Sequence, residues 1–220
     1  MKEVFPGVFQ DKNAIYTLNS VPGRSVYGES LKKEGSHEYR FWDAYRSKLG
    51  AAIVNGLKQL PIRAGSNVLY LGIAEGTTAS HVSDIIGPDG VVFGIDVAPK
   101  VMRKLLTVCE QRQNILPLMA DANHPEEYSK EVEGLEFGCV FEDVAQANQA
   151  EILIRNAKVF LKKGANAMIA VKSQCIDSTR PPKQVFAEVR KELESTFDVL
   201  QEVDLEPFEG GHVLYLLRMK

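Results

Sequence analysis

Two hydrophobic patterns alternate along the chain from residue 60 onward. Short apolar runs predict strands that are buried on both faces, at 67–72, 91–96, 114–121, 137–143 and 166–172. Between these runs, apolar positions recur with a helical period at 77–86, 98–112, 125–132 and 148–163. An alternation of strands and helices is typical of right-handed βαβ units, so the pattern predicts an α/β fold around a mostly parallel sheet.

The C-terminal part of the chain departs from this alternation. A helix is predicted at 181–196, where two prolines precede the helical pattern and suit a first helical turn. Two strands then follow at 199–207 and 212–219, joined by the short link FEGG. A link of this length is typical of a hairpin, so the last two strands should be antiparallel to one another.

The N-terminal part has little helical period at first. Residues 1–35 alternate and contain many turn residues, which indicates a small β-rich unit. Residues 36–60 predict a helical approach to the sheet. We therefore expect a β-rich N-terminal domain with its connecting helix over residues 1–55, and an α/β domain over residues 56–220.

Composition describes an ordinary globular chain with an uneven charge. Its 220 residues suit one large domain or a domain with a small appendage, and the net charge of −3 argues against a simple nucleic-acid binder. Residues 1–63 carry ten Lys and Arg against six Asp and Glu, whereas the remainder carries sixteen against twenty-three. A basic N-terminal part could meet phosphate locally, although ordinary surface scatter is the simpler interpretation of charge alone.

Cysteine usage and hydrophobicity predict an intracellular protein. Cys109, Cys139 and Cys175 are far apart and form no CxxC pair, so we expect neither a metal site nor a disulfide framework. No apolar run of about 18 residues occurs, and the opening MKEVFPGVFQDKN lacks the apolar run of a signal peptide. We expect a cytoplasmic protein that makes no contact with a membrane.

A glycine loop follows the first predicted strand of the α/β part, in the stretch YLGIAEGTTASHVSDIIGPDG. Gly72 and Gly76 are separated by three residues, which fits neither the GxGxxG dinucleotide loop nor the phosphate-binding loop with its lysine. Glycines there still allow a ligand to approach the backbone, at the sheet edge where open α/β folds bind. Thr77 and Thr78 open the next helix and could receive a carboxylate, although a simple tight turn would also explain the glycines.

Three successive strands are predicted to finish in aspartate at this same edge. Asp96 lies where a carboxylate can accept hydrogen bonds from both hydroxyls of a ribose. Asp121 with the backbone N–H of Ala122 could recognise an adenine edge, and Asp143 ends the fourth strand. Any one of these aspartates could be a helix cap. Together with the glycine loop, they favour an adenosine-like ligand with a carboxylate tail, such as S-adenosylmethionine.

Charged residues of other types gather at the same predicted edge. Lys172 ends the fifth strand next to Asp143, where its charge is costly to desolvate unless the side chain extends to solvent. His212 begins the last strand, which the hairpin returns toward this edge, and Lys48 lies at the start of a helix that leads into the sheet. We expect these four side chains to converge.

Long motifs in this chain resemble the fibrillarin family. They include LGIAEGTTASHVSDIIGPDG, MADANHP, EDVAQANQAEILIRNAKVFLKKG, VKSQCIDST, SVYGES, EYRFWDAYRSKLGAAI and LEPFEGGHVLY, so the resemblance covers nearly the whole chain. The chain is similar to the archaeal form, since no glycine- and arginine-rich tail precedes the domain. The resemblance implies a box C/D guide-RNA-directed ribose 2′-O-methyltransferase, the catalytic subunit of an RNP that acts in pre-rRNA and tRNA processing.

The resemblance also implies a fold and a set of site residues. The fold is the Rossmann-like S-adenosylmethionine-dependent methyltransferase fold over residues 56–220, with a seven-stranded, mostly parallel sheet whose last strand is antiparallel, plus the small N-terminal β-rich unit. The implied cofactor residues are Gly72, Gly76, Thr77, Thr78, Asp96, Val97, Asp121, Ala122, Asp143, Val144, Ala145 and Gln146. The implied catalytic residues are Lys48, Asp143, Lys172 and His212.

The chain departs from the family's common pattern at a few positions near this site. Glu142 stands where alanine is frequent, and Asp96 stands where glutamate is more common. Gly210 and Gly211 replace the frequent Arg-Asp pair before the histidine.

The chemistry of ribose methylation agrees with the catalytic residues that the resemblance implies. Methyl transfer from a sulfonium is an in-line displacement, and a ribose 2′-hydroxyl needs help to lose its proton. A lysine that is desolvated near a second cation can act as a neutral base. We expect Lys172 to be this base or to stabilise the developing alkoxide, and Asp143 to orient it. Lys48 would hold the substrate phosphate and favour neutral Lys172, and His212 would support the network.

Partners and two other functions complete the expectations. The resemblance implies a Nop-type scaffold protein, a kink-turn-binding ribosomal-like protein, a box C/D guide RNA, and rRNA or tRNA targets. A scaffold component that binds the cofactor without activity is one alternative, and the presence of Asp143 and Lys172 argues against it. A small-molecule methyltransferase that needs no RNA is the other alternative. The excess of acidic residues after residue 63 is compatible with it.

Overall fold

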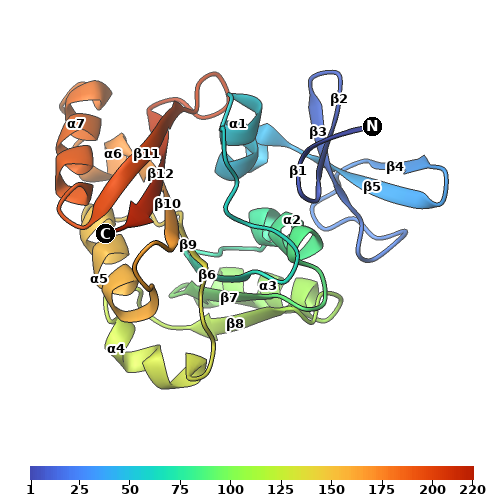
Figure 1. The fold of residues 1–220 in the computed structure, drawn as a ribbon, viewed down its shortest axis with the longest axis horizontal. Helices are drawn as coiled ribbons and strands as arrows, with labels where there is room; N and C mark the ends of the chain where they lie inside the picture. Colours follow the sequence, from blue (N-terminus) through green and yellow to red (C-terminus); the bar gives the residue numbers. More distant parts are fainter.

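The computed structural model comprises residues 1–220 and contains two separate β-sheets flanked by helices (Figure 1). The first sheet is built from the N-terminal residues and is antiparallel throughout, with the strand order β1-β2-β3-β5-β4. Its strands are β1 (Lys2–Phe5), β2 (Val8–Asp11), β3 (Ala14–Leu18), β4 (Leu31–Glu34) and β5 (His37–Trp42). The β-rich character predicted for residues 1–35 is present in these strands.

The helix predicted over residues 36–60 is wrong for most of its length. Strand β5 occupies residues 37–42, a short 3₁₀ helix η1 (Ala44–Arg46) follows, and helix α1 is only seven residues long (Lys48–Val54). Alternate residues of β5 are buried, but two of them are Glu38 and Arg40. Because the buried positions carry charge, a hydrophobic pattern could not reveal the strand.

The second sheet has seven strands in the order β11-β12-β10-β9-β6-β7-β8. Its strands are β6 (Asn67–Leu71), β7 (Val91–Asp96), β8 (Ile115–Met119), β9 (Cys139–Glu142), β10 (Asn166–Lys172), β11 (Phe197–Asp204) and β12 (His212–Met219). The pairings among β6 to β10 are parallel, and β12 is antiparallel to both β10 and β11. The predicted parallel sheet and antiparallel final pair are therefore confirmed.

Helices cover both faces of the seven-stranded sheet. They are α1, α2 (Thr77–Ile86), α3 (Pro99–Cys109), α4 (Pro125–Tyr128), the 3₁₀ helix η2 (Ser129–Val132), α5 (Gln149–Phe160), α6 (Ser173–Ile176) and α7 (Pro182–Leu193). Apolar residues of α1, α2 and α3 pack into one core cluster together with residues of the N-terminal sheet. Apolar residues of α4, α5 and α7 pack into a second cluster on the opposite face (Figure 1). The N-terminal sheet therefore lies on the face that α2 covers.

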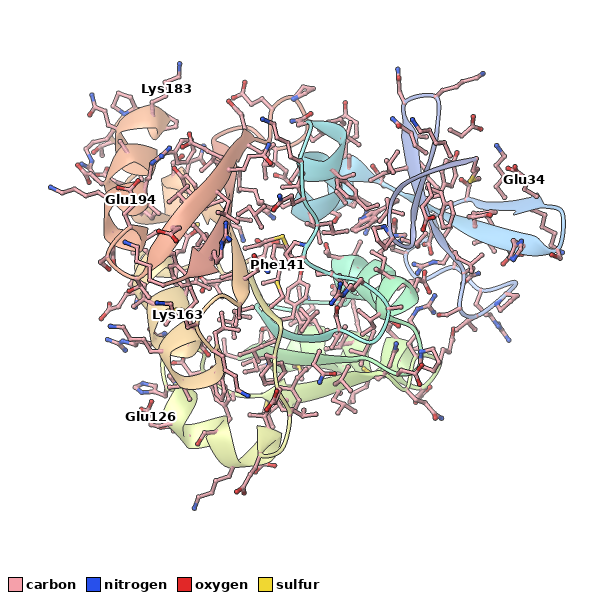
Figure 2. All side chains as sticks on the ribbon, in the orientation of Figure 1. Glu34, Glu126, Phe141, Lys163, Lys183 and Glu194 are labelled. Atoms are coloured by element: carbon pink, nitrogen blue, oxygen red, sulfur yellow. The ribbon has the colours of Figure 1, made fainter.

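Apolar side chains fill the space between these layers. Phe141 of β9 lies in the middle of the molecule, whereas Glu34, Lys183 and Glu194 project from its rim (Figure 2). None of the helices combines the length and the apolar character that crossing a bilayer requires.

The carboxyl ends of the parallel strands lie at one edge of the sheet. Four of these strands lie next to one another in the order β10-β9-β6-β7, and the chain leaves each of them at the same side of the sheet. Residues that directly follow or end these strands therefore lie close together although they are far apart in the sequence. They include Gly72, Asp96, Asp143 and Lys172.

Candidate active site

The glycine loop after β6 passes against the end of β9. Gly72 adopts a φ of 78°, and a Cβ atom at this position would lie 2.7 Å from the carbonyl oxygen of Asp143. Both the backbone angle and the lack of space exclude a side chain here. The backbone N–H of Asp143 donates to the carbonyl of Leu71 at 2.9 Å, so the two strand ends are joined directly. The glycine thus sets the position of Asp143.

A cavity of about 310 Å³ opens at this strand edge. Eight of the predicted cofactor residues line it: Gly72, Asp96, Val97, Ala122, Asp143, Val144, Ala145 and Gln146. Lys172, a predicted catalytic residue, also lines it, together with Ala74, Ile95 and Ala120. The cavity thus has carboxylates and a lysine at its wall and an otherwise largely apolar lining, which suits a ligand with an apolar body and a few polar groups.

The carboxylate of Asp96 is already oriented by the backbone around it. Its two oxygens accept hydrogen bonds from the N–H of Ala74 at 3.0 Å and of Ala98 at 2.9 Å. The first of these bonds connects the end of β7 to the glycine loop. A carboxylate retains further acceptor positions after two such bonds, so Asp96 can still accept from a ligand hydroxyl.

Asp121 does not line the cavity. Its carboxylate accepts hydrogen bonds from the backbone N–H and the side-chain amide of Asn123, both at 2.9 Å, and these bonds lower the pKa of Asp121 below its ordinary value. The Asn123 amide also donates to Gln146 at 2.9 Å, and Gln146 does line the cavity. Asp121 thus supports the cavity wall through Asn123, while its neighbour Ala122 supplies the lining.

The two threonines after the glycine loop lie outside this cavity. Thr77 lines a second cavity of about 340 Å³, whose wall also includes Tyr27, Arg46 and Lys104. Thr78 is buried, and its hydroxyl donates to the Oγ of Ser47 at 2.9 Å. Its hydroxyl is therefore occupied within the protein. The predicted carboxylate contact would have to come from the N–H groups of this helix end or from Thr77.

Asp143 lies between two lysines. Its Oδ2 is 3.2 Å from the Nζ of Lys48, and its Oδ1 is 3.0 Å from the Nζ of Lys172. Each of the three side chains is only about one-sixth exposed. A single carboxylate thus contacts two lysine amines at the cavity wall.

Gln149 orders the end of β10, and the sequence analysis did not single it out. This buried amide accepts from the backbone N–H of Lys172 at 2.9 Å and donates to the Lys172 carbonyl at 3.2 Å. It also donates to the carbonyl of Gln146 at 2.8 Å. One side chain therefore ties the lysine to the loop that lines the cavity. In the sequence, Gln149 is one polar residue at the start of an amphipathic helix, and nothing there indicates that it bonds to Lys172.

His212 lies beside Lys172 without a side-chain bond to it. It pairs with Lys172 across the antiparallel strands β10 and β12, and its Nδ1 lies 2.8 Å from the carbonyl oxygen of Gly210. No hydrogen bond or ion pair joins its side chain to Asp143 or Lys172. A carboxylate absent from the prediction, Glu209, comes within 4.0 Å of the Lys48 amine instead.

Glu142 is fully buried directly before Asp143. Neither oxygen of its carboxyl group has a hydrogen-bond partner. Burial raises the pKa of Glu142 well above its usual value, and the nearby Asp143 charge raises it further, whereas Lys172 opposes the shift. Burial without a partner therefore favours the neutral form of Glu142, because an unpaired buried charge is costly.

Known proteins are similar to this chain over its whole length. The family model for fibrillarin matches residues 1–220. The chain belongs to the fibrillarin family. A fibrillarin-like rRNA/tRNA 2′-O-methyltransferase from Pyrococcus abyssi (strain GE5 / Orsay) is 53% identical to it over 222 residues, which cover 99% of this chain and 97% of that fibrillarin.

Solved fibrillarin structures share the fold described above. Aeropyrum pernix fibrillarin, in complex with natively bound S-adenosyl-L-methionine, is 46% identical with a TM-score of 0.86, over 93% of this chain and 88% of that chain. A fibrillarin/Nop5p complex contains a chain that is 37% identical with a TM-score of 0.90, over 100% of both chains. The resemblance to fibrillarin and the predicted methyltransferase fold are both confirmed.

Proposed function

We propose that this chain is an S-adenosylmethionine-dependent methyltransferase that modifies the ribose 2′-oxygen of rRNA and tRNA. The observation that carries the proposal is Asp143, which contacts both Lys48 and Lys172 at the wall of a cavity that also contains Asp96. Family membership supports it, since the relatives of similar length are 2′-O-methyltransferases of rRNA and tRNA.

The residues around the cavity fit the cofactor. Asp96 would accept from the ribose hydroxyls, Ala122 and Gln146 would border the adenine, and the helix end at Thr77 would receive the carboxylate. The absence of room for a Cβ at Gly72 keeps the glycine loop close to Asp143 and Val144, two other residues of the cavity wall. When bound, S-adenosylmethionine supplies a methyl group on a sulfonium, which is open to in-line displacement.

Lys172 would act on the second substrate. It takes the proton of the ribose 2′-hydroxyl while the 2′-oxygen forms its bond to the methyl carbon and the bond from that carbon to sulfur breaks. Asp143 holds the Lys172 amine in place at 3.0 Å. Lys48 supplies a second positive charge, which attracts the substrate phosphate. His212, on the neighbouring strand, would border the substrate.

We propose that base pairing with a box C/D guide RNA selects the target nucleotide. The partners would be a Nop-type scaffold protein, in keeping with the Nop5p complex of a related chain, and a kink-turn-binding ribosomal-like protein. A net charge of −3 supports this dependence on partners, because it gives the isolated chain little general affinity for RNA.

Replacement of Lys172 tests the proposed chemistry. Lys172→Ala should retain cofactor affinity and assembly with the scaffold protein, but its single-turnover methylation rate on a guided target should fall about 100-fold or more, the usual scale for a lost general base. Raising the cofactor concentration should not restore the rate, because binding is intact. Lys172→Arg should also fail, since a guanidinium cannot accept the proton.

Two outcomes would contradict the assignment. If Lys172→Ala methylates at the wild-type rate in the assembled complex, Lys172 is not the base, and Lys48→Ala and His212→Ala become the variants to measure. If the wild-type chain binds the cofactor but methylates no guided RNA, the chain is a scaffold component and the proposed function is wrong. Methylation of RNA without guide or partners would instead contradict the guided mechanism.

A further inference from the structure

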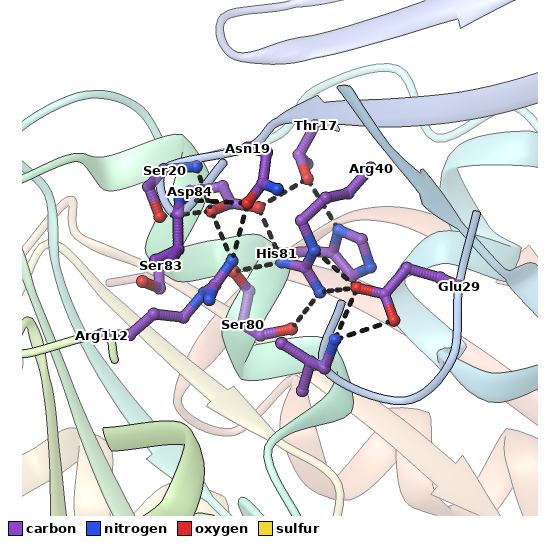
Figure 3. Close-up of polar contacts among 12 residues, drawn as sticks. Thr17, Asn19, Ser20, Glu29, Arg40, Ser80, His81, Ser83, Asp84 and Arg112 are labelled. Carbon is purple, nitrogen blue, oxygen red and sulfur yellow. Dashed lines mark hydrogen bonds and ion pairs between the residues drawn. The ribbon is translucent and has the colours of Figure 1, made fainter. Parts of the chain in front are cut away.

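A network of buried charges joins the N-terminal sheet to helix α2. Arg40 of β5 pairs with Glu29 at 2.6 Å and with Asp84 of α2 at 2.7 Å, and all three side chains are inaccessible to solvent (Figure 3). Arg40 also donates to the carbonyl and hydroxyl oxygens of Ser80, and Arg112 pairs with Asp84 at 3.2 Å. Removal of one partner would leave an uncompensated buried charge, so the sheet and the helix are held firmly together.

His81 extends the same contact along α2. Its two ring nitrogens lie 2.7 Å from the hydroxyl of Thr17 and 2.8 Å from the hydroxyl of Tyr27, and its ring stacks on Trp42 with 4.8 Å between centroids. Asp84 accepts hydrogen bonds from Thr17 and Ser20 as well (Figure 3). The N-terminal sheet and its loops are therefore bonded to the middle of α2, at Ser80, His81 and Asp84.

Ser47 makes a further contact with helix α2. Only five residues separate β5 from α1, and Ser47 is the last of them, directly before Lys48. Ser47 is 2% exposed, and its Oγ accepts from the N–H of Gly50 at 3.1 Å and from the Thr78 hydroxyl at 2.9 Å. The residue before a proposed catalytic lysine is thus bonded to the helix at the proposed cofactor site.

The bond to Thr78 is not required for helix capping. A serine at the N-cap position satisfies that role with its bond to the N–H of Gly50 alone. The second bond runs between different elements, and it is buried. Its effect is to hold the start of α1, where Lys48 lies, against the start of α2.

We propose that Ser47 is a positioning residue for Lys48. Through its bond to Thr78 it fixes the lysine at a constant place relative to the cofactor helix, so that the Lys48 amine reaches Asp143. The N-terminal sheet supplies the rigid support for this bond through the contacts of Arg40 and His81 with α2. The inference rests on the proposed methyltransferase function and assigns a part in it to the N-terminal sheet.

Ser47→Gly is the most direct test. Glycine is tolerated at an N-cap at little cost, so α1 should remain folded while the bond to Thr78 is lost. The single-turnover methylation rate of the assembled complex at saturating cofactor should fall about tenfold, because small displacements of a catalytic group are costly. Calorimetry should show unchanged affinity for S-adenosylmethionine. The control is Ser83→Ala, which removes the 2.6 Å bond to Asn114 from a buried serine of α2 that lies five residues after Thr78, and it should leave the rate unchanged.

A second readout does not depend on catalysis. Limited acetylation of lysine amines, followed by mass spectrometry, should show severalfold faster labelling of Lys48 in Ser47→Gly than in the wild type or in Ser83→Ala. A Lys48 that is labelled at the wild-type rate, or a Ser47→Gly complex that methylates as fast as Ser83→Ala, would overturn the proposal. If even the wild type lacks methylation activity, the proposed function fails, and the labelling result still decides whether Ser47 positions Lys48.

A double-mutant cycle identifies the bond itself. Thr78→Val keeps the shape and the backbone N–H of Thr78 but removes the hydroxyl donor. If the bond between the two side chains is what positions Lys48, the Ser47→Gly/Thr78→Val double variant should methylate no more slowly than the slower of the single variants. Rate losses that multiply would show that the two residues act independently, and the proposal would then be wrong.

Discussion

Individual carboxyl groups at the strand edge differ in their surroundings, and the differences assign them different roles. Asp143 contacts two lysines, Asp96 accepts two backbone N–H groups, and Glu142 is buried without any partner. The first arrangement suits orientation of an amine, the second suits binding of a hydroxyl donor, and the third favours the neutral form of the acid. Two of these residues give predictions.

Asp96→Ala should weaken the binding of S-adenosylmethionine. The loss of a charged hydrogen-bond acceptor should cost about 1.5–3 kcal/mol, which corresponds to a roughly 10- to 150-fold higher dissociation constant by calorimetry. Asp96→Asn keeps one oxygen for the N–H groups of Ala74 and Ala98 and should bind with intermediate affinity. Asp198→Ala, an exposed site on β11, is the control. Equal affinity of Asp96→Ala and the control would remove the ribose assignment.

Glu142 should make the protein less stable as the pH rises. The pKa of Glu142 is raised by burial, so the folded chain keeps a proton that the unfolded chain releases above about pH 4.5. From there up to the folded pKa, its contribution to the free energy of unfolding falls by about 1.4 kcal/mol per pH unit. Urea titrations at pH 5 and pH 7 should show that Glu142→Gln gains stability relative to the wild type at the higher pH. A difference between the two proteins that does not change with pH would contradict this.

At the scale of elements, the contact between the N-terminal sheet and α2 should be sensitive to acid. Burial lowers the pKa of His81 well below its ordinary value, and the charges of Arg40 and Arg112 lower it further. The unfolded chain binds a proton at His81 below about pH 6.5 and the folded chain does not. The contribution of His81 is thus fully present above pH 6.5, and about 1.4 kcal/mol is lost per pH unit below it.

The single tryptophan reports on this contact directly. Trp42 stacks on His81 with 10° between the ring planes, so its fluorescence follows the N-terminal sheet during unfolding. Between pH 7 and pH 5, the wild type should lose stability relative to His81→Gln, whose side chain does not titrate. Urea titrations followed by Trp42 emission measure the difference. If the stabilities of the two proteins change with pH in parallel, protonation of His81 does not differ between the folded and the unfolded chain, and the prediction is wrong.

At the scale of the whole molecule, the isolated chain should bind RNA weakly. The excess of basic residues before residue 64 is outweighed by the acidic remainder of the chain, which leaves a net charge of −3. We expect dissociation constants on the order of 10⁻⁴–10⁻⁶ M for any RNA at physiological salt, the range of non-specific binding. Fluorescence anisotropy with a box C/D guide RNA measures this, with and without the scaffold and kink-turn proteins. Tight and selective binding by the chain alone would contradict the proposed need for partners.

The sequence by itself determined the order of the α/β elements and the strand ends that carry the polar residues. Short apolar runs identify buried parallel strands reliably, because both faces of such strands need apolar side chains. Parallel strands end at one edge, so the proximity of Asp96, Asp143 and Lys172 followed from their positions at strand ends. Long motifs also identified the family without any coordinates.

Only the tertiary structure decided how these residues are held. Strand β5 was missed because its buried positions include Glu38 and Arg40, whose burial is stabilised by partners distant in the sequence. The bonds of Ser47 to Thr78 and of Gln149 to Lys172 were equally invisible, since a serine or a glutamine at the start of a helix has many possible partners. Hydrophobic periodicity records which face of an element is buried, whereas the pairing of buried polar groups depends on which elements meet in space.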